Sequence, residues 1–285
     1  MNIVFVILHY LDLESTLDTV KYIDNQICNK NMNVSLLIVD NNSNNESGIY
    51  LRNLFKNRLD IKVIINKENL GFAKGNNIGY SFAKSNLDPD LIIVMNNDVF
   101  IKDERFLIKL AKIDLTNIHI IGPNIITKDG IYQNPFRVDK ISKKTALKIH
   151  IYNLLIYTLF NIPVLNKIVL SVLNTKNESK NKSSEKPNID HFNVVLHGSV
   201  LIYTYNWIKN EDFAFLPETF MYMEEDILYE YINKKSYSTM FSNELSVVHM
   251  EDAATNKLNS DLLQKRKFIS GEMIKSSKIL LKMMR

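Results

Sequence analysis

Four short apolar segments in the first third of the chain constrain the fold most strongly. Each is about as long as a β-strand, is rich in β-branched residues and is apolar at consecutive positions: Ile3 to Leu8, Val34 to Val39, Ile61 to Ile65 and Leu91 to Met95. Strands with this pattern are covered on both faces by other elements. Helix-like segments separate them, at residues 14–26, 46–57 and 76–85. This alternation predicts an α/β fold with a doubly wound, mostly parallel sheet flanked by helices.

The sequence pattern changes after Phe136. Residues 141–173 carry lysines followed by two apolar runs on either side of Pro163, which predicts a helical insertion. Residues 174–187 are rich in Asn, Lys, Ser and Glu, and we expect them to form a mobile linker. Further strands are expected over residues 192–196, 200–203 and 245–248, and a basic helix over residues 261–285.

The chain therefore divides into four parts along its length. Two halves of one core are expected at residues 1–136 and 191–256, with the helical insertion and linker at 137–190 and the C-terminal basic helix at 257–285. A chain of 285 residues fits one large α/β domain with a small appendage, and 46% hydrophobic residues are enough for a substantial core.

Charge and cysteine content narrow the partners and the compartment. The net charge of +4 comes from 35 basic and 31 acidic residues, and the scattered lysines give no argument for nucleic acid. The same balance is compatible with an anionic membrane surface or an anionic substrate. Cys28 is the only cysteine, so no internal disulfide can form and we expect a cytoplasmic protein.

The N-terminal segment is apolar but has no basic leader and no small-residue cleavage site, so it predicts a buried strand and not a signal peptide. No apolar run reaches the roughly 18 residues that a membrane-spanning helix needs. We therefore expect a protein that is soluble or bound to a membrane surface.

Polar residues directly after the expected strands are the candidates for chemistry, because ligands of parallel sheets bind at the carboxyl ends of the strands. Asp40, followed by Asn41, Asn42 and Ser43, can accept hydrogen bonds from a ribose hydroxyl or a base N–H. Asp98, after Asn96 and Asn97, can ligate Mg²⁺ or Mn²⁺. For both aspartates the alternative is a helix cap or a turn.

A glycine-spaced segment, Asn69 to Gly79, opens a helix between these two positions. Its glycines would let the backbone approach a ligand, and Lys74 with a helix N-terminus would favour phosphate. The segment is neither a Walker loop nor a dinucleotide fingerprint, and a structural turn explains it equally well.

Three consecutive acids, Glu224, Glu225 and Asp226, open another helix beside aromatic and methionine residues. Acids at this position stabilise the helix dipole, and one of them is also a candidate general base. His249 ends an apolar run, where it is either structural or part of a metal site.

Taken in order, these segments resemble the inverting glycosyltransferases of family two, which have a GT-A fold, and especially bacterial enzymes that build surface polysaccharides such as capsules. The resemblance covers about residues 3–136 and 192–256, and the joint order and spacing of the segments are more specific than any one of them. It implies a pocket for a nucleoside-diphosphate sugar, linked to UDP or dTDP, formed by His9, Tyr10, Asp40, Asn42, Gly71, Lys74, Asn76, Asn96 and Asn97.

The resemblance also implies a cofactor, Mn²⁺ or Mg²⁺. Asp98 matches the last position of the family's Asp-X-Asp motif, Asn96 stands at its first position, and His249 matches a residue that helps to hold the metal or the diphosphate. The segment His197, Gly198 and Ser199, together with Glu224, would lie near the acceptor and the donor sugar.

The catalytic base implied by the family is Glu225 or Asp226. Counting back three residues from Leu228 selects Glu225, whereas matching the letters Glu-Asp selects Asp226, and both are kept as candidates. The expected reaction transfers a sugar with inversion to a saccharide or polyprenyl-linked acceptor.

Two other functions remain to be weighed against this transfer. A sugar nucleotidyltransferase should carry a glycine-rich loop with Arg after the first strand, where this chain has His9 to Asp12. A non-catalytic carbohydrate-binding subunit is the second alternative. The insertion at 143–173 predicts either an amphipathic contact with the inner face of the plasma membrane or a hairpin on the core or at a homodimer interface.

Overall fold

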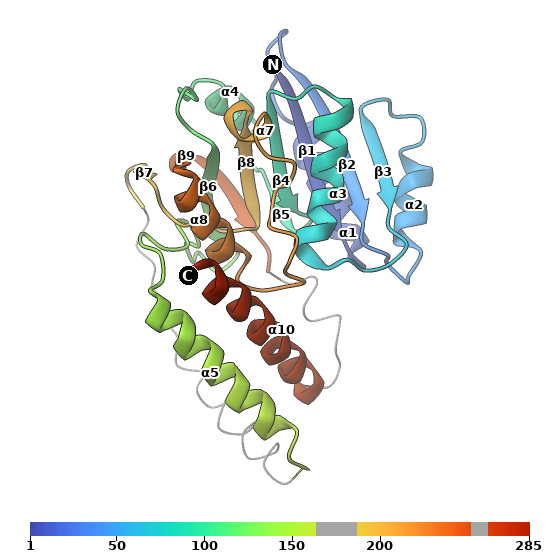
Figure 1. Ribbon diagram of the computed structural model, residues 1–285. Coiled ribbons are helices and arrows are strands. Elements are labelled where there is room, and N and C mark those ends of the chain that lie inside the picture. Colours follow the sequence, from blue (N-terminus) through green and yellow to red (C-terminus); the bar gives the residue numbers. More distant parts are fainter. Residues whose placement is uncertain (164–186, 252–261) are drawn as a thin grey trace.

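A nine-stranded sheet forms the centre of the computed structural model, which describes residues 1–163, 187–251 and 262–285 (Figure 1). The strand order is β3-β2-β1-β4-β8-β6-β9-β5, and β7 pairs with β9 outside this path. The strands are β1 (Asn2–His9), β2 (Asn33–Asp40), β3 (Ile61–Ile65), β4 (Leu91–Asn96), β5 (Val99–Phe100), β6 (Ile120–Thr127), β7 (His191–Phe192), β8 (Val200–Thr204) and β9 (Thr239–His249).

The sheet is mostly parallel, as the sequence predicts. β1 pairs in parallel with β2 and β4, β2 with β3, and β6 with β9. β8 lies antiparallel between β4 and β6, so β6 and β9 point the same way as the first four strands. Only β8 and the two-residue strands β5 and β7 run in the opposite direction within the described residues.

Helices cover both faces of the sheet. The described helices are α1 (Leu13–Asp24), α2 (Ser47–Leu54), α3 (Gly71–Asn86), α4 (Phe106–Leu110), α5 (Lys143–Phe160), α7 (Tyr205–Ile208), α8 (Glu224–Lys235) and α10 (Leu262–Met283). One core lies under α1, α2 and α4 and contains Phe5, and the other lies under α3, α7 and α8 and contains Val6. Adjacent strand residues thus enter opposite cores, which explains why the strands are apolar at consecutive positions and confirms the predicted fold class.

Helices α5 and α10 lie side by side beneath one end of the sheet (Figure 1). Ala146 of α5 and Leu280 of α10 form a third, small core with Met223 and Ile227 at the start of α8. None of the helices that the structure describes is both long and apolar enough to cross a membrane. The second apolar run of the insertion (164–173), the linker expected at 174–187 apart from its last residue, and the first residues of the expected C-terminal helix (257–261) lie outside the described residues.

Among the expected elements, three differences from the structure stand out. The strand expected at 192–196 is present only as β7, because Asn193 has a φ of 55° and turns the chain out of the extended conformation. β6 was not expected, since its Gly122-Pro123 pair is typical of a turn. Here Pro123 lies at a register shift in the pairing with β9, a position that tolerates the missing N–H. α3 begins at Gly71, five residues before the expected Asn76.

Candidate functional site

The carboxyl ends of three parallel strands place the first predicted residues at one edge of the sheet. In the strand register His9 of β1 lies beside Asp40 of β2, and Leu8 of β1 lies beside Asn96 of β4. Residues that are far apart in the sequence therefore meet at this edge, where parallel sheets bind their ligands.

His9 lies next to the Asp40 carboxylate in the interior of the fold. Its ring is fully buried, with Nδ1 2.6 Å from Thr16 Oγ1 and Nε2 2.7 Å from Ser47 Oγ. The Asp40 carboxylate lies 3.9 Å from His9 Nε2 and accepts a hydrogen bond from the Ser43 backbone N–H at 3.2 Å. The tight turn anticipated for Asp40 is thus present, and His9 meets hydroxyl groups of this chain at both ring nitrogens.

Gly48, at the start of α2, leaves room for the Asp40 carboxylate. A Cβ at this position would lie 2.2 Å from Asp40 Oδ2, so a larger residue would displace the side chain. Asn42, with a φ of 63°, is exposed beyond the turn, and Tyr10 is half-buried at the end of β1. Asp40 itself is only 2% exposed, whereas Asn42 and Tyr10 reach the surface of this corner.

Asn41 is a structural hub that the sequence reasoning did not single out. Its Nδ2 donates to Asn69 Oδ1 at 2.9 Å and to the Gly71 carbonyl at 3.1 Å, and its Oδ1 accepts from the Leu70 N–H at 3.0 Å. The side chain is buried and ties the end of β2 to the beginning of α3. The only sequence signal for this role is the position of an asparagine directly after an apolar strand.

The glycines of the predicted phosphate segment allow α3 to pack closely. Gly71 has a φ of +78°, and a Cβ there would lie 2.4 Å from the Phe220 carbonyl oxygen. A Cβ at Gly75 would lie 2.8 Å from Leu8, so this glycine lets the helix approach the sheet. The segment is therefore the first two turns of a helix and not a separate loop.

Two polar side chains of α3 have contrasting positions. Lys74 is exposed, whereas Asn76 is 1% exposed and donates from Nδ2 to the Phe72 carbonyl at 3.0 Å. Asn76 Oδ1 has no hydrogen-bond partner among the described residues. Asn77, which the sequence reasoning did not select, fixes the loop after α7 by accepting from the Ala214 and Phe215 N–H groups.

Asp98 and His249 form a pair across β5 and β9. Val99 lies opposite His249 in this antiparallel pairing, which brings Asp98 Oδ1 to 3.4 Å from His249 Nε2. Gln133 Oε1 lies 2.8 Å from His249 Nδ1. If Nδ1 carries the proton and donates it to Gln133, the neutral ring turns the Nε2 lone pair toward the Asp98 carboxylate.

This donor set fits a hard divalent cation. Two acceptor groups that face each other need a proton or a cation between them, and carboxylate oxygen with imidazole nitrogen suits Mn²⁺ or Mg²⁺. Within residues 1–163, 187–251 and 262–285 no group of three or more His, Cys, Asp or Glu side chains is arranged so that it could hold a metal ion. A two-residue site leaves coordination positions for oxygens of a ligand. Asn97 lies apart from it, since its Nδ2 donates to the Asp12 carbonyl at 3.1 Å.

His197 connects this pair to the next part of the site. Its ring centroid lies 5.8 Å from that of His249, and its Nδ1 accepts a hydrogen bond from the Ser199 N–H at 3.1 Å. Burial lowers the pKa of His197, and the nearby His249 lowers it further, although the charges of Glu225 and Asp98 oppose both effects. The ring is therefore neutral at physiological pH, with its proton on Nε2.

A cavity of about 440 Å³ lies beside His197 and brings together seven of the predicted residues. These are Asn96, His197, Gly198, Ser199, Glu224, Glu225 and Asp226. Arg137 from the segment before α5 and Met273 from α10 also line it, and the rest of the wall is mainly apolar: Phe72, Phe136, Ile149, Met221, Tyr222 and Met223. The other predicted residues do not line this cavity: His9, Tyr10, Asp40, Asn42, Gly71, Lys74, Asn76, Asn97, Asp98 and His249.

The two candidate bases differ in their surroundings. Glu225 is half-buried, and its Oε1 accepts a hydrogen bond from the Gly198 N–H at 3.2 Å. Asp226 is buried and forms an ion pair with the Arg137 guanidinium, which neutralises its charge. A carboxylate held by arginine is a weaker base than one that faces a cavity, so the contacts favour Glu225. No sequence signal pointed to Arg137.

Glu224 is buried beside a second acid from the C-terminal helix. Burial raises the pKa of Glu224 to about 8, with further contributions from the charges of Glu225 and Glu272. In the described part of the chain Glu224 Oε1, Tyr222 Oη and Glu272 Oε2 are buried without a hydrogen-bond partner. Tyr222 and Met223 both have positive φ angles, 72° and 65°. Consecutive bulky residues in this conformation are strained, and such strain concentrates at functional sites.

Comparisons with known proteins agree with this architecture. The sequence profile of glycosyl transferase family 2 matches residues 5–175. No curated protein sequence matches the chain significantly. Among solved structures, S. aureus TarS 1-349 in complex with UDP-GlcNAc is 15% identical with a TM-score of 0.54, and the match covers 89% of this chain and 60% of TarS 1-349. This chain therefore spans less than two thirds of that structure.

Two further structures share the fold. The mannosyltransferase PcManGT from Pyrobaculum calidifontis, in complex with GDP-Man and Mn²⁺, is 10% identical with a TM-score of 0.52, and the match covers 98% of this chain and 69% of PcManGT. GalNAc-T7 with UDP, GalNAc and Mn²⁺ is 11% identical with a TM-score of 0.56, and the match covers 88% of this chain and 44% of GalNAc-T7.

Proposed function

The chain belongs to glycosyl transferase family 2, and from this membership we propose that it transfers a sugar from a nucleoside-diphosphate sugar to a hydroxyl group of a saccharide or lipid-linked saccharide. The observation that carries the proposal is the position of His197. Its ring is 5.8 Å from the ring of His249, and it lines the same cavity as Glu225. The candidate cation pair, Asp98 and His249, and the candidate base Glu225 are therefore both close to the His197 ring.

Glu225 is the proposed catalytic base. Its carboxylate takes the proton of the acceptor hydroxyl, whose oxygen forms a bond to the anomeric carbon as the bond from that carbon to the diphosphate oxygen breaks. Attack opposite the leaving group inverts the configuration. The Gly198 N–H orients the Glu225 carboxylate, and no side chain at position 198 intrudes, since a Cβ there would lie 3.1 Å from Oε1.

Asp98 and His249 are the proposed holders of Mn²⁺ or Mg²⁺, an ion that when bound offsets the negative charge developing on a leaving diphosphate. Gln133 orients the His249 ring, and such partners of metal ligands affect metal affinity strongly. PcManGT and GalNAc-T7 were both solved with Mn²⁺ and a nucleotide, which supports this choice of cofactor.

The first half of the core, residues 1–136, is the proposed nucleotide-binding half, and residues 191–256 supply the acceptor side. Asp40 would accept hydrogen bonds from the base or the ribose, with Tyr10 and Asn42 beside it, and His9 positions the Asp40 carboxylate. Exposed Lys74 would approach the diphosphate. UDP and dTDP are the proposed nucleotides, and the TarS complex with UDP-GlcNAc is consistent with the former.

Helix α5 supports a location at the cytoplasmic face of a bacterial plasma membrane, where surface polysaccharides such as capsules are assembled on lipid-linked acceptors. Helix α5 exposes apolar side chains: Leu147, Ile151, Tyr152, Leu154, Leu155 and Tyr157. Its first turns carry exposed Lys143, Lys144 and Lys148, and the helix contains no acid. An apolar face beside lysines binds anionic bilayers. A homodimer interface is the competing use of this face.

A donor panel tests the proposed activity. The purified chain is incubated with Mn²⁺ and a series of UDP-, dTDP- and GDP-sugars, and release of nucleoside diphosphate is measured beside the Glu225→Gln variant. We expect one donor to be turned over by the wild type and not by the variant. Calorimetry that showed no Mn²⁺-dependent binding of any nucleotide sugar would refute the proposal and leave a non-catalytic subunit.

A further inference from the structure

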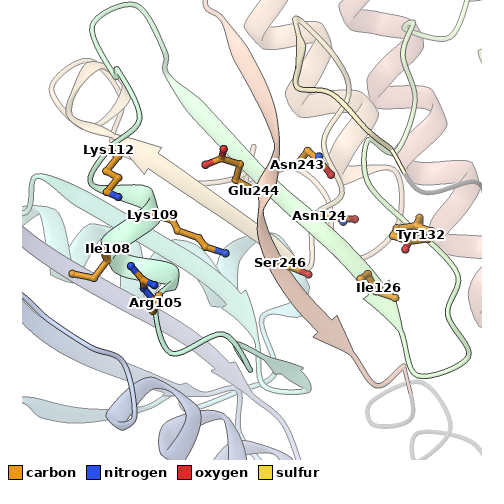
Figure 2. Close-up of a pocket in the computed structure, with 10 residues that line it drawn as sticks. All are labelled: Arg105, Ile108, Lys109, Lys112, Asn124, Ile126, Tyr132, Asn243, Glu244 and Ser246. Carbon is orange, nitrogen blue, oxygen red and sulfur yellow. The ribbon is translucent and has the colours of Figure 1, made fainter.

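A second cavity, of about 580 Å³, lies between α4 and the strands β6 and β9 (Figure 2). It shares no residue with the cavity beside Glu225. Its wall consists of Arg105, Ile108, Lys109, Lys112, Asn124, Ile126, Tyr132, Asn243, Glu244 and Ser246. Figure 2 shows the three cationic side chains on and beside α4, with Asn124, Asn243 and Ser246 along the strands across from them.

An irregularity in the pairing of β6 with β9 borders this cavity. Pro123 pairs with Ser242, but the next residue, Asn124, pairs with Ser246. β9 thus carries three extra residues, 243–245, and a bulge of this kind bends the strand and re-aims its side chains. Bulges are frequent beside binding sites.

Two amide oxygens in this cavity lack partners. Asn124 is 2% exposed, and neither its Oδ1 nor that of Asn243 has a hydrogen-bond partner among the described residues. A buried polar atom without a partner costs free energy, so such atoms usually meet a water molecule or a ligand. These two oxygens would accept hydrogen bonds from hydroxyl groups.

The opposite wall supplies positive charge. Arg105 and Lys112 are exposed, and neither side chain forms an ion pair within the described residues. Lys109, between them, is paired with Asp103 at 2.6 Å. Glu244 is exposed and is the only acid in the wall. The cavity therefore presents more positive than negative groups, as a site for an anion does.

From the amide oxygens on one wall and the cations on the other we infer that the cavity binds a saccharide that carries an anionic group, such as a uronic acid or a sugar phosphate. Sugar hydroxyls would donate to Asn124 and Asn243, while the carboxylate or phosphate accepts from Arg105 and Lys112. A purely anionic ligand would leave the amide oxygens unused, and a neutral sugar would leave the cations unused. A saccharide with a charge uses both walls.

The cavity also lies close to the proposed metal pair. Tyr132 lines it, and the next residue, Gln133, contacts His249. The inferred site is nevertheless separate from the proposed reaction, because neither Arg105 nor Lys112 has a role in it. Binding can be measured without a donor nucleotide, so the result is independent of whether the chain transfers a sugar.

The test is calorimetric or saturation-transfer titration of the full chain with glucuronic acid, glucose 6-phosphate, glucose and inorganic phosphate at low salt. The variant Arg105→Ala/Lys112→Ala removes two exposed cations. Lys56→Ala/Lys67→Ala, at exposed positions elsewhere, makes the same charge change and serves as the control. We expect the first variant to bind glucuronic acid about tenfold more weakly and the control to match the wild type.

A second variant tests the amide wall. Asn124→Ala should weaken glucuronic acid binding and leave inorganic phosphate unaffected, with circular dichroism confirming the fold. Equal affinity for glucose and glucuronic acid would overturn the inference, because charge would then not be recognised. It would also be overturned by equal losses in the cation variant and its control, or by phosphate binding as tightly as either acidic sugar.

Discussion

The buried carboxyl group of Glu224 makes the stability of the fold depend on pH in an unusual direction. Its pKa is raised from the ordinary 4.5 to about 8 by burial and by the negative charge of Glu225. Between these two values the folded chain keeps a proton that the unfolded chain has released. Because the folded state then binds more protons, the free energy of unfolding falls as pH rises through this window, by about 1.4 kcal/mol per unit.

The size of the effect follows from the same two values. At pH 7 the loss relative to pH 4.5 is about 3 kcal/mol, and above pH 8 it levels off slightly above about 4 kcal/mol. Glu224→Gln replaces the carboxyl group with a neutral amide of the same shape and removes this pH dependence. The variant should therefore gain stability relative to the wild type as pH rises. Any difference in hydrogen bonding adds a constant that does not vary with pH.

Urea unfolding followed by tryptophan fluorescence measures this difference. Trp207, the only tryptophan, is fully buried in α7 and reports on the core. The stability of the variant minus that of the wild type should rise between about pH 5 and pH 8 and then become constant. Glu218→Gln, at an exposed position in the preceding loop, is the matched control and should show no such rise. A difference that stayed constant from pH 5 to pH 8 would refute the reasoning, since Glu224 would then already be ionised at pH 5.

Four further variants test the proposed site and the proposed membrane face. Asp98→Asn should lower turnover by about two orders of magnitude or more and weaken Mn²⁺ binding in a metal titration; unchanged Mn²⁺ affinity would count against the cation pair. Glu225→Gln should reduce turnover about 10²–10⁴-fold at unchanged stability. Asp226→Asn should instead lower the free energy of unfolding by about 1–2 kcal/mol, because it leaves the arginine unpaired, and a larger kinetic loss from this variant would reverse the assignment of the base. Ile151→Gln/Leu155→Gln should reduce flotation with anionic vesicles at least about tenfold, whereas a shift from dimer to monomer with no change in flotation would show that α5 is a dimer interface.

The first half of the fold could be predicted because its central strands β1 and β4, and most of β2, are buried on both faces. Continuous apolar runs such as Ile3 to Leu8 identify such strands without knowledge of their neighbours. β6 escaped detection because Gly122 and Pro123 are typical of turns, and they are tolerated only at the irregular pairing with β9. That pairing joins segments more than one hundred residues apart, so no local pattern contains it.

The candidate site was predictable in position but less so in orientation. Because ligands of parallel sheets bind at the carboxyl ends of the strands, Asp40, Asn96 and Asp98 could be predicted to lie at one edge. The sequence could not show that the Asn97 side chain donates to the Asp12 carbonyl or that the His9 ring is enclosed. Contacts from elsewhere in the chain help to distinguish the three acids of α8. Arg137 pairs with one acid, Gly198 with the next, and the charge of Glu272 acts on Glu224.

The antiparallel direction of β8 affects which parts of the proposed site can change in sequence independently of the parallel strands. β8 enters the sheet where β4 leaves it, and the Asn96 N–H donates to the carbonyl of Ser199, the residue just before β8, at 2.9 Å. The segment that leads into β8 therefore contacts the end of β4, although it is not part of the parallel strands. The part of this segment before His197 can change over generations while β1 to β4 keep their register, because His197 and Gly198 already serve the proposed site. The proposed acceptor side can thus change through one short segment, and the half of the fold that is proposed to bind the nucleotide is left intact.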